Sequence, residues 1–309
     1  MYQFLCRTDL ADESHESFIK NSQSKECDGV NIEKTSNGDI NISRVEVTTE
    51  QGAQNIGKPI GKYITIDINP NASDRSQNIE AVAQQLKTEL RNILPNSLNA
   101  PIMVVGLGNW NITPDSLGPK VVDQVYVTRH LFKLMPNDVP DGVKSICALT
   151  PGVLGITGIE TAEIVKSVVQ EVKPAVVVAI DSLASRKLQR VSTTIQLSNT
   201  GINPGSGIGN NRNAVSAETL GVPVIAIGVP TVVDAATLAG DCIDMIIEKE
   251  KLEWNLDDDK RDILEQVLAP TVLGNVVVTP KEVDTMIEDL SEMIANGINY
   301  AFHEDKVFE

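Results

Sequence analysis

Short runs of valine and isoleucine recur beyond residue 100, and they constrain the fold of this chain more than any other feature. Each run ends at Gly, Pro, Asn or Asp and precedes a stretch with apolar residues at helical spacing. Such runs are typical of strands covered on both faces, and their alternation with helices indicates parallel pairing through right-handed crossovers. We therefore predict a doubly wound, mostly parallel, twisted α/β sheet, with strands within residues 102–109, 143–152, 174–182, 222–231 and 275–280.

The first hundred residues have a different character. Residues 11–41 are polar, which predicts an exposed or loosely packed arm. Residues 42–47 and 62–68 have the β-branched or alternating pattern of strands, and residues 76–94 repeat apolar side chains at helical spacing. Residues 192–199 alternate polar and apolar side chains, which predicts an edge strand or an antiparallel strand. We expect an N-terminal α+β extension packed on the core.

Composition excludes several classes of function. The 309 residues carry 26 Lys and Arg against 42 Asp and Glu, and a net charge of -16 would repel a nucleic acid. No apolar run approaches the roughly 20 residues of a membrane span, and the first ten residues do not resemble a secretory signal, so we expect a cytoplasmic protein. The four cysteines form no C-x-x-C pair and the three histidines lack zincin spacing, which argues against a zinc site.

Two acids follow strands of the predicted core. Asp115 lies in the loop after the strand within 102–109, and Asp181 directly ends the apolar run that precedes it. Reactive groups of open α/β sheets gather at the carboxyl ends of strands, where paired carboxylates can share a proton or activate a water. Either aspartate could instead cap a helix or a turn. Spacing leaves both interpretations open.

Two glycine-containing loops are weaker signals. The first, residues 106–111, begins like a dinucleotide fingerprint but lacks its third glycine and its later acid, so we expect no such cofactor. The second, residues 203–211, has glycines spaced so that backbone amides could face an oxyanion. Simple connections are the alternative for both loops. The possible supporting residues are Gly106, Asn109, Gly205 and Gly207.

Several longer segments together resemble the germination protease family of spore-forming bacteria. They occur in the family's order and span most of the chain. The segments are RTDLADE, VVGLGNWNITPDSLGPK, TRHLF, TPGVLGITGIET, AIDSLASR, GINPGSGIGN, GVPVIAIGVPTVVDA and VTPKEVD.

The resemblance implies a fold and an activity. The fold would be a twisted α/β sheet similar to that of hydrogenase maturation proteases, assembled as a homotetramer. The activity would be that of an endopeptidase made in the forespore cytoplasm as an inactive zymogen, which trims its own N-terminus and later degrades small acid-soluble spore proteins in the spore core during germination. We expect no cofactor, and the resemblance leaves the participation of a metal open.

The resemblance also implies roles for particular residues. The family's two essential aspartates fall on T-P-D-x-L-G-P-K, here Asp115, and on A-I-D-x-L-A, here Asp181. Thr8-Asp9-Leu10-Ala11 matches the family's cleavage pattern, so the cut would fall between Asp9 and Leu10. The domains would be a propeptide over 1–9, an N-terminal part over 10–99 and a catalytic core over 100–309. Residues 246–266 are compact where family members can carry a long insertion.

Two other functions compete with this one. A hydrogenase-maturation-type metalloprotease would use acids and a histidine on a metal, but no histidine follows a predicted strand. A noncatalytic α/β module that binds a nucleoside or a peptide would use the glycine loops as its pocket and both aspartates as caps.

Overall fold

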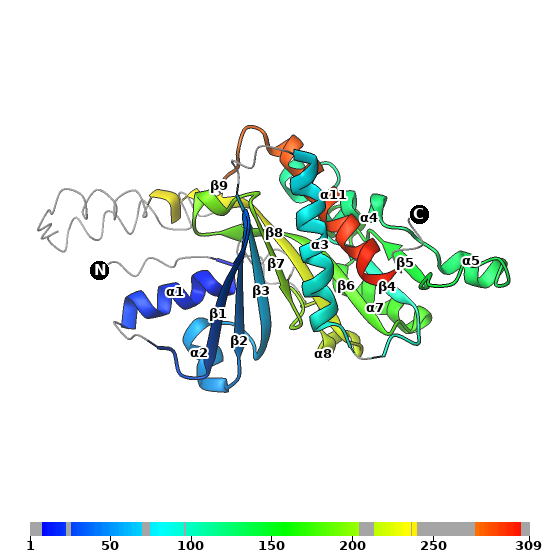
Figure 1. Cartoon of the computed structure of the whole chain (residues 1–309), viewed down its shortest axis with the longest axis horizontal. Coiled ribbons are helices and arrows are strands. Elements are labelled where there is room, and N and C mark those ends of the chain that lie inside the picture. Colours follow the sequence, from blue (N-terminus) through cyan, green and yellow to red (C-terminus); the bar gives the residue numbers. More distant parts are fainter. Residues whose placement is uncertain are drawn as a thin grey trace, which may run out of the picture.

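The computed structural model describes residues 8–22, 26–69, 75–95, 97–203, 213–235, 237–239 and 276–303. Within them, nine strands form a single sheet in the order β1-β2-β3-β7-β8-β6-β4-β5, with β9 paired to β8 (Figure 1). The strands are β1 (Val30–Asn37), β2 (Ile40–Val47), β3 (Gly61–Ile68), β4 (Ile102–Gly106), β5 (Ile146–Leu149), β6 (Val176–Ser185), β7 (Thr194–Ser198), β8 (Val224–Asp234) and β9 (Val277–Val278).

Helices cover both faces of this sheet. The α-helices are α1 (Ala11–Ser22), α2 (Glu50–Ile56), α3 (Arg75–Ile93), α4 (Leu117–Gln124), α5 (Arg129–Leu134), α6 (Leu154–Thr157), α7 (Thr161–Val172), α8 (Ala217–Leu220) and α11 (Val283–Phe302). Two 3-10 turns, η1 (Thr113–Asp115) and η2 (Leu188–Arg190), lie in connections. None of the described helices has the length and apolar character needed to cross a membrane.

The parallel half of the sheet confirms the α/β prediction. Strands β5, β4, β6 and β8 pair in parallel in that order. Their Val and Ile runs are buried because helices cover both sides, as continuous apolar strands require. The fifth predicted strand, within 275–280, differs: β9 has two residues and pairs antiparallel with β8. It is therefore a short addition to β8 rather than a further parallel strand of the core.

The antiparallel half continues the same sheet. Strands β1, β2 and β3 form a meander, and β7 joins β3 to β8 with antiparallel pairing on both sides. The prediction of an antiparallel strand near residues 192–199 is confirmed, but β7 lies inside the sheet and not at its edge. The N-terminal α+β extension and the parallel core thus share one continuous sheet.

Three layers follow from the alternation of side chains along the strands. Helices α3, α4 and α11 cover one face, where they bury the largest apolar cluster (Figure 1). The apolar side of α3 faces the sheet through Val82, Leu86 and Leu90, each without exposed surface, as its helical spacing predicts. On the other face, α7 and α8 cover the parallel strands, and α1 and α2 cover β2 and β3.

The expectation of a loosely packed arm over residues 11–41 is wrong for its first part. Residues 11–22 form α1, whose first turn is buried, including Asp12 and Glu13 with at most 1% of their surface exposed. Both acids are satisfied by partners more than 170 residues away, so a polar composition here hides packing that a local pattern cannot reveal. Strand β1, by contrast, is exposed over nearly its whole length.

Candidate active site

Asp181 lies inside β6 and not at its end. The strand continues to Ser185, so the expectation that Asp181 terminates the strand is wrong. Asp181 is buried, with 5% of its surface exposed, and its Oδ1 accepts a hydrogen bond from the Ser182 amide at 2.9 Å. Because strand pairing with β8 continues past this point, the bond caps no turn. The register places Asp181 opposite Gly228 of β8.

Asp115 is the last residue of η1, in the connection from β4 to α4. This turn lies against β6 and β8, and the Thr231 hydroxyl donates to the Pro114 carbonyl oxygen at 2.7 Å. The residue at the N-cap of α4 is Ser116, so Asp115 does not occupy the capping position. The half-buried Asp115 is thus carried beyond the carboxyl end of β4, the parallel neighbour of the strand that holds Asp181.

The loop before Asp115 depends on small residues and on Asn109. Gly108 has φ +109°, and a Cβ there would come 2.0 Å from the Asp115 carbonyl oxygen. Gly106 packs so closely on α4 that a Cβ would meet the Gly118 carbonyl oxygen at 2.2 Å. The backbone amide of Asn109 donates to the Asp115 carbonyl oxygen at 2.8 Å, and the Asn109 side-chain Oδ1 accepts the Asn111 amide at 3.0 Å. Gly106 and Asn109 therefore shape the loop, whereas Gly205 and Gly207 lie outside the described residues.

The Asp9–Leu10 bond lies against β6. The Asp9 amide donates to the Ala184 carbonyl oxygen at 3.0 Å, and the Ala184 amide donates to Asp9 Oδ2 at 2.9 Å. Leu10 has no exposed surface. The bond is therefore held against the same strand that carries Asp181, a contact that composition does not reveal.

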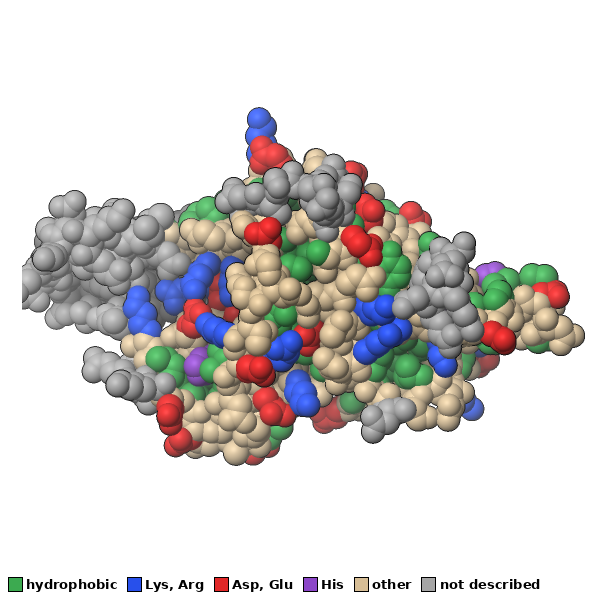
Figure 2. Space-filling view, viewed as in Figure 1, with side chains coloured by type: hydrophobic (Ala, Val, Ile, Leu, Met, Phe, Trp, Pro, Cys, Tyr) green, Lys and Arg blue, Asp and Glu red, His purple; other side chains and the backbone are tan. Residues whose placement is uncertain are grey.

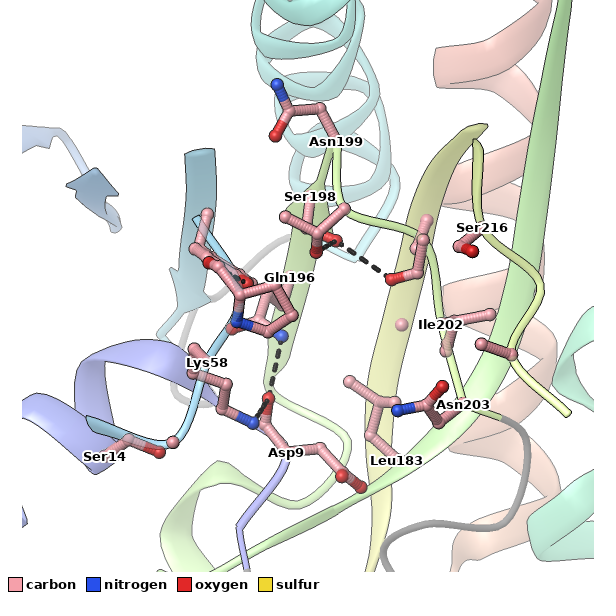
Figure 3. A pocket seen from close by; sticks show the side chains of 18 of the residues that line it. Asp9, Ser14, Lys58, Leu183, Gln196, Ser198, Asn199, Ile202, Asn203 and Ser216 are labelled. Carbon is pink, nitrogen blue, oxygen red and sulfur yellow. Dashed lines mark hydrogen bonds between the residues drawn. The ribbon is translucent and has the colours of Figure 1, made fainter. Parts of the chain in front are cut away.

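Two side chains converge on the carbonyl oxygen of Asp9. Lys58 Nζ donates to it at 2.9 Å and Gln196 Nε2 at 3.0 Å, whereas the Asp9 carboxylate points away from both (Figure 3). Gln196 Oε1 also accepts the Ala11 amide at 2.8 Å. Sequence reasoning missed both residues. Lys58 follows α2 and Gln196 lies on β7, in no motif, and only the sheet brings them together.

Lys58 is partly buried. Burial lowers the pKa of its ammonium group, and the nearby acids Asp9 and Glu13 oppose this shift. Besides Asp9, Nζ donates to the Thr8 carbonyl oxygen at 3.3 Å. A buried ammonium is stable only where acceptors satisfy its protons, and here the backbone before Leu10 supplies them. The lysine is therefore directed at the peptide chain around the Asp9–Leu10 bond.

An ion-pair network holds α1 in place beside this bond. Arg190 makes a bidentate pair with Asp12, with both N–O distances at 2.7 Å, and also contacts Asp67 at 2.9 Å. Glu13 accepts the Arg186 and Lys187 amides, at 2.8 and 3.2 Å. Bidentate Arg–carboxylate contacts are strong and directional. The segment that follows residue 10 is thus anchored to the connection between β6 and β7.

A cavity of about 710 Å³ opens next to the Asp9 carbonyl. Asp9, Lys58, Gln196 and Gly228 are among the residues that line it, and Figure 3 shows polar side chains of β7 and the following loop around it. The side chain of Leu183 lies over Gly228, where a Cβ would approach it to 2.4 Å. The lack of a side chain at residue 228 therefore makes room for the Leu183 side chain.

Charged side chains and possible metal ligands do not gather into one cluster within the described segments. Acidic and basic side chains are interspersed on the face shown in Figure 2. Among the described residues, no three His, Cys, Asp or Glu side chains are grouped so that they could hold a metal ion. In the part of the chain that the structure describes, the side chains that contact the Asp9 carbonyl oxygen are those of Lys58 and Gln196.

Comparison with known proteins gives consistent similarity over the chain. The family model described as germination protease matches residues 6–258 and 252–308. The germination protease of Clostridium perfringens is 47% identical over 315 residues, covering 98% of this chain and 97% of that protein. The germination protease of Bacillus subtilis (strain 168) is 44% identical over 352 residues, covering 98% and 94%.

Similarity to solved structures is much weaker. A [NiFe] hydrogenase maturation protease, HycI from Thermococcus kodakarensis, aligns with a TM-score of 0.33 and 13% identity, covering 68% of this chain and 98% of that one. A hydrogenase 2 maturation peptidase from a Thaumarchaeota archaeon aligns with a TM-score of 0.22 and 20% identity, covering 50% and 99%. Alignments at this level carry no argument about function.

Proposed function

This chain belongs to the germination protease family, and on that premise we propose that it is an endopeptidase made as a zymogen that trims its own N-terminus. The cut falls between Asp9 and Leu10, which releases residues 1–9 as a propeptide. The mature enzyme then degrades small acid-soluble spore proteins in the spore core when germination begins.

One observation carries the self-processing part of the proposal. Asp9 bonds to Ala184 of β6 through its backbone amide and through its carboxylate, and β6 also contains the buried Asp181. These two bonds fix the position of Asp9 relative to β6. The uncut chain thus presents one particular bond to the sheet beside the proposed acid.

The proposed chemistry uses Asp115 and Asp181 to activate a water. One ionised carboxylate accepts a proton from the water, and the water oxygen forms a bond to the Asp9 carbonyl carbon. The bond from that carbon to the Leu10 nitrogen then breaks, and the nitrogen takes a proton to leave as an amine. Two neighbouring carboxylates favour this division of labour because they do not both ionise readily.

The remaining parts of the proposal concern organisation. Residues 10–99 form the N-terminal part that continues the sheet, residues 100–309 form the catalytic core, and four chains assemble into a homotetramer. The protein acts in the cytoplasm of the forespore and in the spore core, without nucleic acid or membrane as partner. The proposal assigns no cofactor and leaves open whether a metal takes part. Residues 246–266 lie outside the described residues.

Neither competing function is favoured. The relatives that match nearly the whole chain are germination proteases, which disfavours a hydrogenase-maturation-type metalloprotease. A noncatalytic binding module would leave unexplained why the Asp9 carbonyl oxygen receives two side-chain donors. Processing of the purified chain at mildly acidic pH, followed by mass measurement and N-terminal sequencing, tests the proposal. We expect a new N-terminus at Leu10, and a chain that stays intact under all conditions would contradict it.

A further inference from the structure

We propose that Lys58 and Gln196 form the oxyanion hole of the self-processing reaction, an inference that rests on the function proposed above. The two side chains donate to the carbonyl oxygen of Asp9, at 2.9 and 3.0 Å. This oxygen belongs to the bond that is cut in the proposed reaction. It would become an oxyanion when water adds to the carbonyl carbon.

The geometry of the donors fits this role. Effective oxyanion donors lie about 2.7–3.1 Å from the oxygen and are fixed before the reaction begins. Lys58 and Gln196 reach the oxygen from separate elements, the loop after α2 and the middle of β7, so their two bonds come from different directions (Figure 3). Gln196 is itself held by the Ala11 amide, which bonds to its Oε1.

The charge and burial of Lys58 strengthen the argument. The ammonium group of Lys58 donates to two neutral carbonyl oxygens, and the carboxylates of Asp9 and Glu13 compensate only part of its charge, since burial still lowers its pKa. Negative charge on the Asp9 carbonyl oxygen would compensate the remaining positive charge of Lys58 as the tetrahedral intermediate forms. The interaction would therefore be stronger in the transition state than in the uncut chain, which is the condition for a catalytic contribution.

Gln196 adds a role in register. Its amide nitrogen donates to Asp9 and its amide oxygen accepts from Ala11, so one side chain holds the backbone on both sides of the Asp9–Leu10 bond. A shift of the chain by one residue would break both contacts. The same two bonds can form with any extended substrate, because they involve backbone groups alone.

The reaction balances with water as the only co-reactant. The water oxygen bonds to the Asp9 carbonyl carbon, and the π electrons move onto the oxygen that Lys58 and Gln196 contact. When the carbonyl reforms, the bond to the Leu10 nitrogen breaks and this nitrogen receives a proton. The products are a carboxylate at Asp9 and an amine at Leu10, and neither donor side chain is consumed.

The test compares Lys58→Met and Gln196→Met with Lys62→Met in the full-length chain. Lys62 is a matched control because it is half exposed on β3, where it faces Glu46 at 4.0 Å, away from the Asp9 carbonyl. We expect the rate constant of self-processing to fall about 100-fold or more in the first two variants, the size of effect seen when one oxyanion donor is removed. Lys62→Met should process at the original rate.

A peptide substrate containing Thr-Asp-Leu-Ala separates catalysis from binding in the matured enzyme. We expect kcat to fall in the Gln196→Met variant while KM changes only a few-fold, because the donors act mainly in the transition state. Lys58→Arg should restore part of the lost rate, since arginine keeps the charge. If Lys58→Met fails to fold, the Gln196→Glu variant tests the inference instead. Glutamate keeps the side-chain shape and the oxygen that accepts the Ala11 amide, but it loses the N–H that donates to the Asp9 carbonyl oxygen.

Two results would overturn the inference. Unchanged rates in the Lys58 and Gln196 variants would show that neither donor contributes to the reaction. Faster processing in Lys58→Met would show that the lysine restrains the uncut chain. Either result leaves the proposed function standing as long as the wild-type chain is cut before Leu10. A wild-type chain that is never cut would instead contradict the proposed function itself.

Discussion

Asp181 and Gln196 face the same side of the sheet, and each of them is paired with Gly228, which lies between them on β8. Residues directly opposite in a sheet point to the same face, so one β8 residue lies between the buried acid and the amide that holds the Asp9 carbonyl, and the Leu183 side chain covers that glycine. This arrangement places the proposed acid and the Asp9–Leu10 bond on one face. The predictions below follow from it and from the contacts around it.

Removing either proposed catalytic acid should stop the reaction without unfolding the protein. Asp115→Asn and Asp181→Asn each replace an ionisable oxygen by an amide, so we expect self-processing and substrate cleavage to be lost. Mass measurement over time checks this, with circular dichroism to verify the fold. Asp123→Asn, at an exposed position of α4, should behave as the wild type. Normal activity in either of the first two variants would rule out their joint role.

The side chain of residue 9 should decide where maturation occurs. Asp9→Lys removes the acceptor of the Ala184 amide and replaces an anion that raises the pKa of Lys58 by a cation, so we expect maturation to stop. Asp9→Glu keeps a carboxylate and should mature. N-terminal sequencing of the product should begin at Leu10 in the wild type. A different first residue, or normal maturation of Asp9→Lys, would contradict the assignment.

The pH profile of processing should have an alkaline limb that depends on Lys58. Burial lowers the pKa of this lysine below its usual 10.5, against the opposing effect of Asp9 and Glu13. Lys58 must be protonated to donate to the Asp9 carbonyl oxygen, so the processing rate should fall as pH rises through this lowered pKa. Lys58→Arg should move the loss to higher pH, because arginine keeps its charge. An unchanged alkaline limb in that variant would contradict the assignment.

Breaking the Arg190–Asp12 pair should weaken the attachment of α1. Arg190→Met leaves the Asp12 carboxylate buried without its main partner, so we expect a loss of about 3–5 kcal/mol in the free energy of unfolding. Denaturant unfolding measures this loss. Lys187→Met, which removes an exposed pair with Glu16, should cost less than about 1 kcal/mol. Equal effects of the two changes would show that burial does not matter here.

Gly108 should be needed for the loop that carries Asp115. A Cβ at residue 108 would lie 2.0 Å from the Asp115 carbonyl oxygen, on a backbone with φ +109° that side chains disfavour. We expect Gly108→Ala to displace the loop and to reduce the processing rate by at least tenfold, measured by mass over time. Gly155→Ala is the matched control, because a Cβ there meets nothing within 4 Å. Normal processing in Gly108→Ala would show that the loop tolerates displacement.

The sequence by itself determined the parallel half of the fold and drew attention to Asp115 and Asp181. Strands β4, β6 and β8 are encoded by local runs of Val and Ile, because burial on both faces requires apolar residues at every position. The aspartates were found because they interrupt or follow such runs. Their joint action stays a prediction.

Only the tertiary structure decided how the N-terminal segment is held and which side chains meet the Asp9 carbonyl. Gln196 contacts Asp9 across 187 residues of sequence, and Arg190 contacts Asp12 across 178. Each of these side chains is polar, and in the sequence each is typical of an exposed residue. Their burial is stable because hydrogen bonds and ion pairs replace water, and those partners exist only after the sheet has brought distant segments together. Local pattern cannot encode such pairs.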